Sequence, residues 1–174
     1  MNARTAILLA VAAVVLAVLV LVSQRREAPV QAPVRVLFDV EADRISRVTI
    51  FEGETRVAAR RKGRDWIQEY PVSGPTDSGL WNDRCRALAR LEYDRAFKVP
   101  PESLGAYGLD PPVSVAVFEV DSGRVFKAEF GKESQAGPRS FARLPDDPRV
   151  FMVFRAARDH FRIKIDRDFI GGKK

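Results

Sequence analysis

Cysteine and histidine are almost absent from this 174-residue chain, which has one of each, Cys85 and His160. A single cysteine excludes an intramolecular disulfide and any metal site built from several thiolates. A single histidine excludes a site with several histidine ligands from one chain. The glycine-rich dinucleotide fingerprint and the G-x-S-x-G turn of many hydrolases are missing as well. The sequence therefore contains no recognisable catalytic or metal-binding site, and we expect no cofactor.

Three short features could still suggest chemistry, and each has a simpler explanation. Gly131-Lys132-Glu133-Ser134 lacks the earlier glycine of a phosphate-binding loop, because that position is Phe126. Asp146 and Asp147 lie between two prolines, which is typical of an exposed turn rather than of a buried acid–base pair. His160 has no accompanying nucleophile motif, so we interpret it as a surface residue near the end of the chain.

One long hydrophobic run is present, from Ala6 to Val22, and Ser23-Gln24-Arg25-Arg26 follows it. At about 1.5 Å per residue, a helix over this run would reach roughly 25 Å, the short end of what crosses a bilayer core. A small soluble domain needs no helix that is apolar on every face. The alternative is a cleaved signal peptide, but no small residues stand at the −3 and −1 positions just after the run. We therefore interpret residues 1–23 as an uncleaved transmembrane signal anchor.

The charges that flank this run leave its orientation open. Arg4 precedes the run, whereas Arg25, Arg26 and Arg35 follow it. The positive-inside rule would then keep the C-terminal domain in the cytoplasm. A run that begins so close to the amino terminus also resembles a signal anchor, which often exports the chain that follows it.

The rest of the chain divides into a linker, a domain and a tail. Residues 24–35 contain two prolines and little periodicity, which predicts an extended linker. Residues 36–166 carry strand and helix patterns and form the predicted domain, and residues 167–174 form a C-terminal tail. Hydrophobic residues make up 46% of the sequence and charged residues 30%, a balance that favours a globular domain over a disordered chain.

The first half of the domain predicts strands followed by a helix. Ile45–Phe51 and Thr55–Arg61 alternate apolar and polar residues around the turn Glu52-Gly53-Glu54, which predicts a β-hairpin. Asp65–Tyr70 predicts a third strand, which ends at Pro71. Beyond the helix caps offered by Ser73–Ser78, an apolar stripe predicts an amphipathic helix; its members are Leu80, Trp81, Cys85, Leu88 and Leu91.

Two residues of this predicted helix need separate comment. Cys85 lies on the apolar stripe, where we expect a small core residue rather than a nucleophile. Arg84 also falls within the stripe, so we expect its head group to extend out to water.

The second half predicts a short helix, two further hairpins and a terminal helix. Pro100–Ser103 can begin the short helix, and Tyr107–Pro112 can end it. We expect Gly108 to adopt the left-handed conformation and Leu109 to be buried against the sheet. The hairpins pair 113–120 with 124–130 and 140–144 with 150–154, and a helix or turn runs from Ala156 to about Phe161. The predicted fold class is therefore α+β: antiparallel sheet built from hairpins, one main amphipathic helix and short helices on one face, and an N-terminal transmembrane helix.

Several of these residues together resemble a known family. They are Phe38, Ile45, Trp66, Pro71, Tyr107-Gly108-Leu109-Asp110-Pro111-Pro112, Phe130-Gly131, Phe141-Ala142-Arg143 and Val150-Phe151-Met152-Val153. The pattern resembles domain-of-unknown-function family 4340 from about Phe38 to Ile165, with one copy of a unit that longer members repeat. The stretch from Tyr107 to Pro111 is its most specific part, whereas Phe141 stands where the family more often has tyrosine.

The resemblance implies a location and a general role. Members of the family are largely bacterial envelope proteins with an N-terminal anchor, often encoded near transporter-like genes. It thus implies an inner (plasma) membrane protein with a single span, a periplasmic domain and an accessory role. It transfers no catalytic residues to this chain.

A basic cluster in the first hairpin is the one candidate binding feature. The formal net charge is +6, and Arg56, Arg60 and Lys62 point to one side of a strand, where Arg47 of the partner strand can join them. We identify these residues as candidate contacts for an anionic lipid surface or wall polymer. The simpler explanation is a solvated hairpin face that discourages edge aggregation. Nucleic acid is not expected, because no motif that reads it is present.

The sequence leaves two classes of function open. The first is a non-enzymatic, membrane-anchored envelope module that docks on a membrane complex, such as a transporter-like one. The second is an envelope hydrolase or another enzyme with an unrecognised site. A cleft with convergent polar groups and shifted pKa values would favour the enzyme, and an exposed apolar or basic patch would favour the docking module.

Overall fold

The computed structural model describes residues 35–135 and 137–164. The predicted anchor from Ala6 to Val22, the linker before Arg35 and the tail at 167–174 lie outside the described residues. Within the described part, every helix is too short or too polar to cross a membrane.

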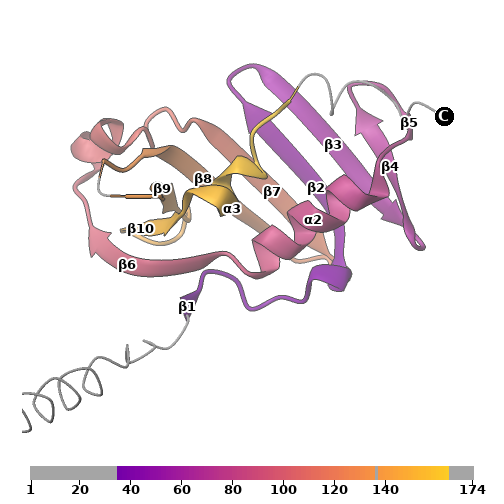
Figure 1. Cartoon of the computed structure of the whole chain (residues 1–174), viewed down its shortest axis with the longest axis horizontal. Helices are drawn as coiled ribbons and strands as arrows, with labels where there is room; N and C mark the ends of the chain where they lie inside the picture. Colours follow the sequence, from indigo (N-terminus) through magenta and orange to yellow (C-terminus); the bar gives the residue numbers. More distant parts are fainter. Residues whose placement is uncertain (1–34, 136, 165–174) are drawn as a thin grey trace, which may run out of the picture. The chain divides into compact units, whose positions relative to one another are not determined.

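The described strands form one antiparallel sheet of ten strands (Figure 1). Their spatial order is β1-β6-β10-β9-β8-β7-β2-β3-β4-β5. In chain order the strands are β1 (Arg35–Val36), β2 (Ile45–Glu52), β3 (Thr55–Lys62), β4 (Asp65–Tyr70), β5 (Gly74–Pro75), β6 (Glu92–Lys98), β7 (Ser114–Val120), β8 (Val125–Glu133), β9 (Arg139–Arg143) and β10 (Arg149–Phe154). The fold is therefore α+β and dominated by antiparallel sheet, as the hairpin patterns predict.

The predicted hairpins are confirmed, and one long-range pairing joins the two halves of the domain. The turn after β2 places Gly53 at φ 58°, a conformation that glycine adopts without steric cost. Strand β2 pairs with β3 on one side and with β7 on the other, so that Val48 lies between Ala59 and Phe118. The hairpins β7–β8 and β9–β10 then continue the sheet on that side.

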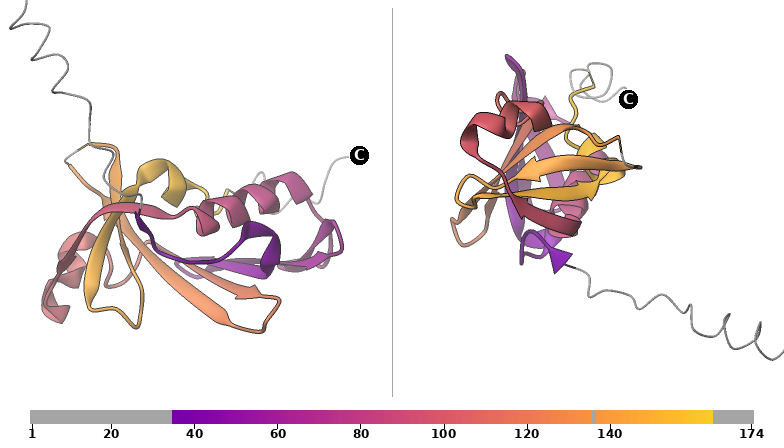
Figure 2. Two further views of the ribbon diagram at one scale, coloured as in Figure 1. Left: turned by 90° about the horizontal axis from the view of Figure 1, so that it is seen from below. Right: turned by 90° about the vertical axis from the view of Figure 1, so that its left-hand side faces the viewer.

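Helix α2 (Ser78–Ala89) and helix α3 (Arg155–Asp159) lie on the same face of the curved sheet, which we call the inner face (Figure 2). Asp77 caps α2 by accepting hydrogen bonds from the amides of Gly79 and Leu80, because its carboxylate satisfies amides that have no helical partner. The predicted stripe is buried at Trp81, Cys85, Leu88 and Leu91, whereas Leu80 is half-buried. Trp81 stacks on Trp66 of β4 with ring centroids 5.8 Å apart.

The prediction for Arg84 is wrong. Its side chain is 2% exposed rather than extended into water. Its guanidinium lies 4.6 Å from the centroid of the Trp81 ring, and its Nε donates a hydrogen bond of 3.0 Å to the carbonyl of His160. The aromatic ring and the carbonyl beyond α3 replace part of the water that the charge loses.

The short helices do not all pack on one face, which corrects a second expectation. The 3-10 helix η1 (Ala42–Arg44) precedes β2, and the 3-10 helix η2 (Pro101–Tyr107) lies on the face opposite α2, which we call the outer face (Figure 2). There η2 forms a separate small core, in which Leu104, Leu109 and Val150 are buried. It covers the end of the sheet formed by β6, β9 and β10.

The loop after η2 has the conformation that its sequence predicts. Gly108 has φ 66°, and Leu109 is 1% exposed. A Cβ atom built on Gly131 of β8 would lie 2.2 Å from the carbonyl oxygen of Tyr107. The loop thus rests directly on the β8 backbone, and only glycine at position 131 leaves room for it.

Three strands were not predicted, and all of them lie at the margins of the sheet. Strand β6 pairs with β10, so that Phe97 lies opposite Val150. The two-residue strands β1 and β5 add short edges beside β6 and β4. Short terminal strands limit the length of free edge that another chain could join.

Candidate functional site

Most of the outer face is not covered by any described helix, because α2 and α3 lie on the inner face and η2 covers only one end of the outer face (Figure 2). Over β2, β3, β4 and β7 the described residues place no second layer on it. Large apolar side chains are accordingly exposed there: Phe51 is 37% exposed, Tyr70 43% and, at the far end of the face, Val125 63%. Phe51 and Tyr70 both lie against Arg56, so these two rings form one local apolar patch, whereas exposed apolar side chains that stand alone are ordinary on a folded domain.

The predicted basic cluster lies on this face, but two of its members share one acid. Arg47 lies directly opposite Arg60 in the register of β2 and β3. Arg47 Nε donates to Glu69 Oε2 at 2.8 Å, and Arg60 Nε lies 3.1 Å from Glu69 Oε1. The hydrogen bond from Arg47 holds the pKa of the Glu69 carboxyl below its usual value. This carboxylate therefore offsets part of the positive charge that the sequence suggests.

Arg56 has a different environment from Arg47 and Arg60. Its guanidinium carbon lies 5.8 Å from the centroid of the Phe51 ring and 5.1 Å from that of Tyr70. Phe51 comes from β2 and Tyr70 from β4, the two strands that flank β3. Among the described residues, no hydrogen-bond acceptor or carboxylate pairs with this guanidinium. The rings thus hold the guanidinium of an exposed arginine.

The remaining predicted member, Lys62, is the last residue of β3 and is exposed.

A second group of ion pairs on the outer face surrounds Glu129 of β8, which is 5% exposed. Lys127 lies 2.7 Å from it, and Arg143 donates to it from β9. Burial would raise the pKa of Glu129, but the hydrogen bonds from Lys127 and Arg143 outweigh burial and lower it. The outer face therefore carries paired charges at both margins.

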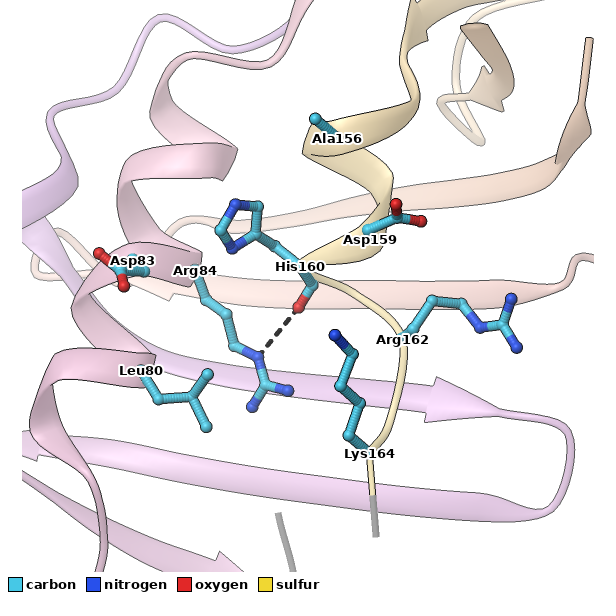
Figure 3. A pocket seen from close by; sticks show the side chains of 8 residues that line it. All are labelled: Leu80, Asp83, Arg84, Ala156, Asp159, His160, Arg162 and Lys164. Atoms are coloured by element: carbon cyan, nitrogen blue, oxygen red, sulfur yellow. Dashed lines mark hydrogen bonds between the residues drawn. The ribbon is translucent and has the colours of Figure 1, made fainter. Parts of the chain in front are cut away.

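A pocket of about 240 Å³ lies on the other side of the molecule, between α2 and the segment that follows α3 (Figure 3). Its lining includes basic, acidic and imidazole groups, and Figure 3 shows Arg84 reaching from α2 toward the chain after His160. The lining residues are Leu80, Asp83, Arg84, Ala156, Asp159, His160, Arg162 and Lys164. Among the described residues that line it, none is a serine, threonine or cysteine.

His160 remains accessible at this pocket, as a surface residue should. Partial burial of the imidazole lowers the pKa of His160, although the nearby Asp83 carboxylate opposes the shift. The ring is therefore neutral at pH 7 and able to accept a proton.

The other weak candidates lie where their simpler explanations place them. Cys85 is fully buried, and burial raises the pKa of its thiol to about 11, so the thiolate nucleophile is scarce at neutral pH. Asp147 pairs with Arg149, whose hydrogen bond lowers the pKa of that carboxyl. Gly131 and Glu133 belong to β8. Across residues 35–135 and 137–164, no group of three acidic, histidine or cysteine side chains could hold a metal ion.

Sequence reasoning missed the residues that organise the outer face. Glu69 and Tyr70 lie at the end of β4, where a register shift against β3 brings both close to the arginines. Nothing in the local pattern of Asp65–Tyr70 indicates that shift. The contact between Phe51 and Arg56 could have been predicted, because the register of the β2–β3 hairpin places these two residues directly opposite each other.

No family model matches this chain, and neither a curated protein nor a solved structure is detectably similar to it.

Proposed function

We propose that this chain is a non-enzymatic, membrane-anchored envelope module that docks on a membrane complex through the outer face of its sheet. The resemblance to domain-of-unknown-function family 4340 and the hydrophobic run at Ala6–Val22 support the anchor and the periplasmic location. The uncovered outer face supports docking. In this proposal the inner face holds the domain together, while the outer face recognises a partner.

The observation that carries the proposal is the uncovered surface over β2, β3, β4 and β7. A sheet that faces water on one side usually alternates apolar residues inside with polar residues outside. Here the water side also exposes Phe51 and Tyr70 and partly exposes Val115 and Val117. Aromatic side chains and arginine are the residue types enriched at protein–protein interfaces.

A substitution in the middle of this face tests the proposal. Thr49 lies between Ala58 and Val117 in the sheet, so Thr49→Arg places a long charged side chain at the centre of the surface. We expect the full-length protein, extracted in mild detergent, to elute as a larger complex and Thr49→Arg to elute as free protein. Ala156→Arg adds the same side chain at an exposed position of α3 on the inner face and serves as the matched control. A complex that survives Thr49→Arg but dissociates with Ala156→Arg would contradict docking through the outer face.

The proposed anchor and topology need their own measurements. The mature protein should begin near its encoded start, and a mass-spectrometric start beyond Ser23 would instead indicate cleavage. A cysteine introduced at the exposed turn residue Ser122 should react with an impermeant maleimide in intact spheroplasts. Cys85 is buried and gives little background. Labelling only after lysis would place the domain in the cytoplasm.

The pocket beside His160 supports a second candidate, an enzyme that uses this imidazole as a general base on water. The supporting observation is the lowered pKa of a histidine that faces Asp83 and Asp159 in one pocket. Such an enzyme should hydrolyse p-nitrophenyl esters or phosphates, with a rate that rises as the pH passes through a value below 6.5. The activity should disappear in His160→Gln. We favour the docking module, because the enzyme rests on one imidazole, whereas the exposed aromatic and arginine side chains of the outer face together support docking.

A further inference from the structure

Arg56 is the one predicted cluster member that aromatic rings hold in place. The Phe51 and Tyr70 rings lie on the two neighbouring strands, so the sheet itself sets their spacing around the guanidinium. When aromatic rings stack on the faces of a guanidinium, its N–H groups can still donate hydrogen bonds, because they lie in the guanidinium plane. Because Arg56 has no hydrogen-bond or ion-pair partner within the described part of the chain, those donors are available to another molecule.

The charges around Arg56 favour binding of a single carboxylate group over binding of a broad anionic surface. Arg47 and Arg60 share Glu69, and Lys127 and Arg143 share Glu129. A polybasic membrane contact needs several lysines or arginines that act together. Apart from the exposed Lys62 at the end of β3, the described outer face instead presents one stacked guanidinium among paired charges. A single guanidinium matches the planar, two-oxygen geometry of a carboxylate.

The surroundings of Arg56 also call for apolar contact. Tyr70 and Val72 are 43% and 71% exposed, and Phe51 is 37% exposed. A partner that covers these side chains would exclude water from the ion pair and strengthen it. A free carboxylic acid would not cover so much surface, whereas a folded protein segment would.

We infer that Arg56, clamped between Phe51 and Tyr70, is a receptor for an aspartate or glutamate side chain of a partner protein, with apolar partner residues packed over Tyr70 and Val72. This inference rests on the proposed docking function and names the contact at its centre. The carboxylate would accept two N–H donors of the guanidinium in a bidentate pair. The partner is thus defined by an acidic residue that has apolar neighbours.

Site-specific photo-crosslinking in intact membranes tests this contact on the full-length chain. A p-benzoylphenylalanine replaces the exposed Val72, two residues beyond Tyr70, and leaves Phe51, Arg56 and Tyr70 unchanged. The crosslinked peptide is identified by mass spectrometry. We expect an adduct with one protein, on a segment that contains an acidic residue. The adduct yield should fall about tenfold or more in Arg56→Gln, as expected when a hydrogen-bonded charge pair is lost. It should also fall in Arg56→Lys, which keeps the charge but loses the two-pronged geometry.

Lys62→Gln is the matched control, because it removes one positive charge from an exposed position of the same strand. We expect this variant to leave the adduct unchanged. Arg56→Glu combined with an acid-to-arginine change at the mapped partner residue should restore it. Equal loss in Lys62→Gln, an adduct mainly with lipid, an adduct with a second copy of this chain, or no protein adduct would overturn the inference.

A second crosslinker position separates this inference from the proposed function. Val125 is 63% exposed at the opposite end of the outer face. Suppose that a crosslinker at Val125 captures a membrane protein, that Thr49→Arg abolishes this capture, and that a crosslinker at Val72 captures nothing. The docking function would then stand, and the inference about Arg56 would be wrong. If neither position captures a protein, and Thr49→Arg leaves every complex intact, the docking function fails as well.

Discussion

Strands β2 and β3 present two very different surfaces on their two sides. On the inner face, Val48, Ile50, Val57 and Ala59 have no measurable exposure beneath α2. On the outer face, the alternate positions include Thr49, Phe51 and arginines, and the arginines are held by Glu69 or by aromatic rings. Stability is therefore concentrated on one side of the sheet, and the other side is left available for contact.

The opposite end of the outer face shows what coverage does to the same kind of surface. There η2 and the loop at Tyr107–Pro112 bury Leu109 and Val150, and the loop rests on Gly131 without an intervening side chain. Where a second layer exists, the outer face becomes core. Where the described chain provides none, it keeps exposed aromatic residues, and this is the surface that the proposed partner would cover.

The sharpest test of the inner–outer difference is a pair of aromatic truncations. Trp81 is 1% exposed and stacks on Trp66, so Trp81→Ala should lower the free energy of unfolding by about 3–5 kcal/mol. Phe51→Ala on the outer face should cost only about 1–1.5 kcal/mol, because part of that ring is already in water. Urea unfolding of both variants measures the difference. Equal losses would mean that the outer face is part of the stabilising core.

The second test concerns the loop that covers the end of the outer face. In Gly131→Ala, the new Cβ would lie 2.2 Å from the Tyr107 carbonyl oxygen, so the loop or β8 must move. We expect a loss of about 2–3 kcal/mol, typical of overpacking. Gly74→Ala is the control, since a Cβ there meets nothing within 4 Å. A neutral Gly131→Ala would show that the loop does not rest on β8.

The third test separates backbone conformation from contact within that loop. Gly108 has φ +66°, and a Cβ there would lie 2.9 Å from the Lys132 amide nitrogen, whereas Gly53 has φ +58° with open space around it. In both alanine variants the left-handed conformation lowers the free energy of unfolding by about 1 kcal/mol. Gly108→Ala should therefore lose about 1 kcal/mol more than Gly53→Ala in thermal or urea unfolding. If Gly53→Ala were as costly, the contact with β8 would contribute nothing.

Local patterns predicted most of the fold because its hairpins are local. The turn at Gly53, the stripe of α2 and the left-handed Gly108 each follow from residues close together in sequence. Strand β6 was missed because Glu92–Lys98 shows no clear alternation, and its pairing with β10 joins distant segments. No short window records such a pairing.

The site was harder to predict than the fold, since it depends on contacts between segments. Arg84 was expected in water, yet Trp81 and the distant carbonyl of His160 hold it in the interior. The basic cluster was identified by residue type, but Glu69 arrives from β4 through a register shift. Composition therefore indicates where charge lies along a strand and leaves open which charges are paired.

The smallest expected effect concerns the ion pairs that offset part of the positive charge of the outer face. Arg47 and Glu69 have side chains that are 48% and 27% exposed, and such exposed pairs contribute about 0.2–1 kcal/mol. Arg47 lowers the pKa of the Glu69 carboxyl in the folded protein. A carboxyl whose pKa is lower folded than unfolded stabilises the fold above its unfolded pKa, and this contribution is lost as pH falls through the folded pKa.

Glu69→Gln should therefore be less stable than the unsubstituted protein at pH 7 by less than about 1 kcal/mol. That difference should shrink as the pH falls below the usual glutamate value of 4.5. Urea midpoints at pH 7, 5 and 3 follow it, and Glu54→Gln, in the exposed turn of the same hairpin, controls for the change in net charge. Because Glu69→Gln also releases Arg47 and Arg60, it should strengthen binding of the full-length protein to anionic vesicles relative to Glu54→Gln. If the two variants bind vesicles equally, then Glu69 does not screen these arginines, and the outer face is more basic than its ion pairs indicate.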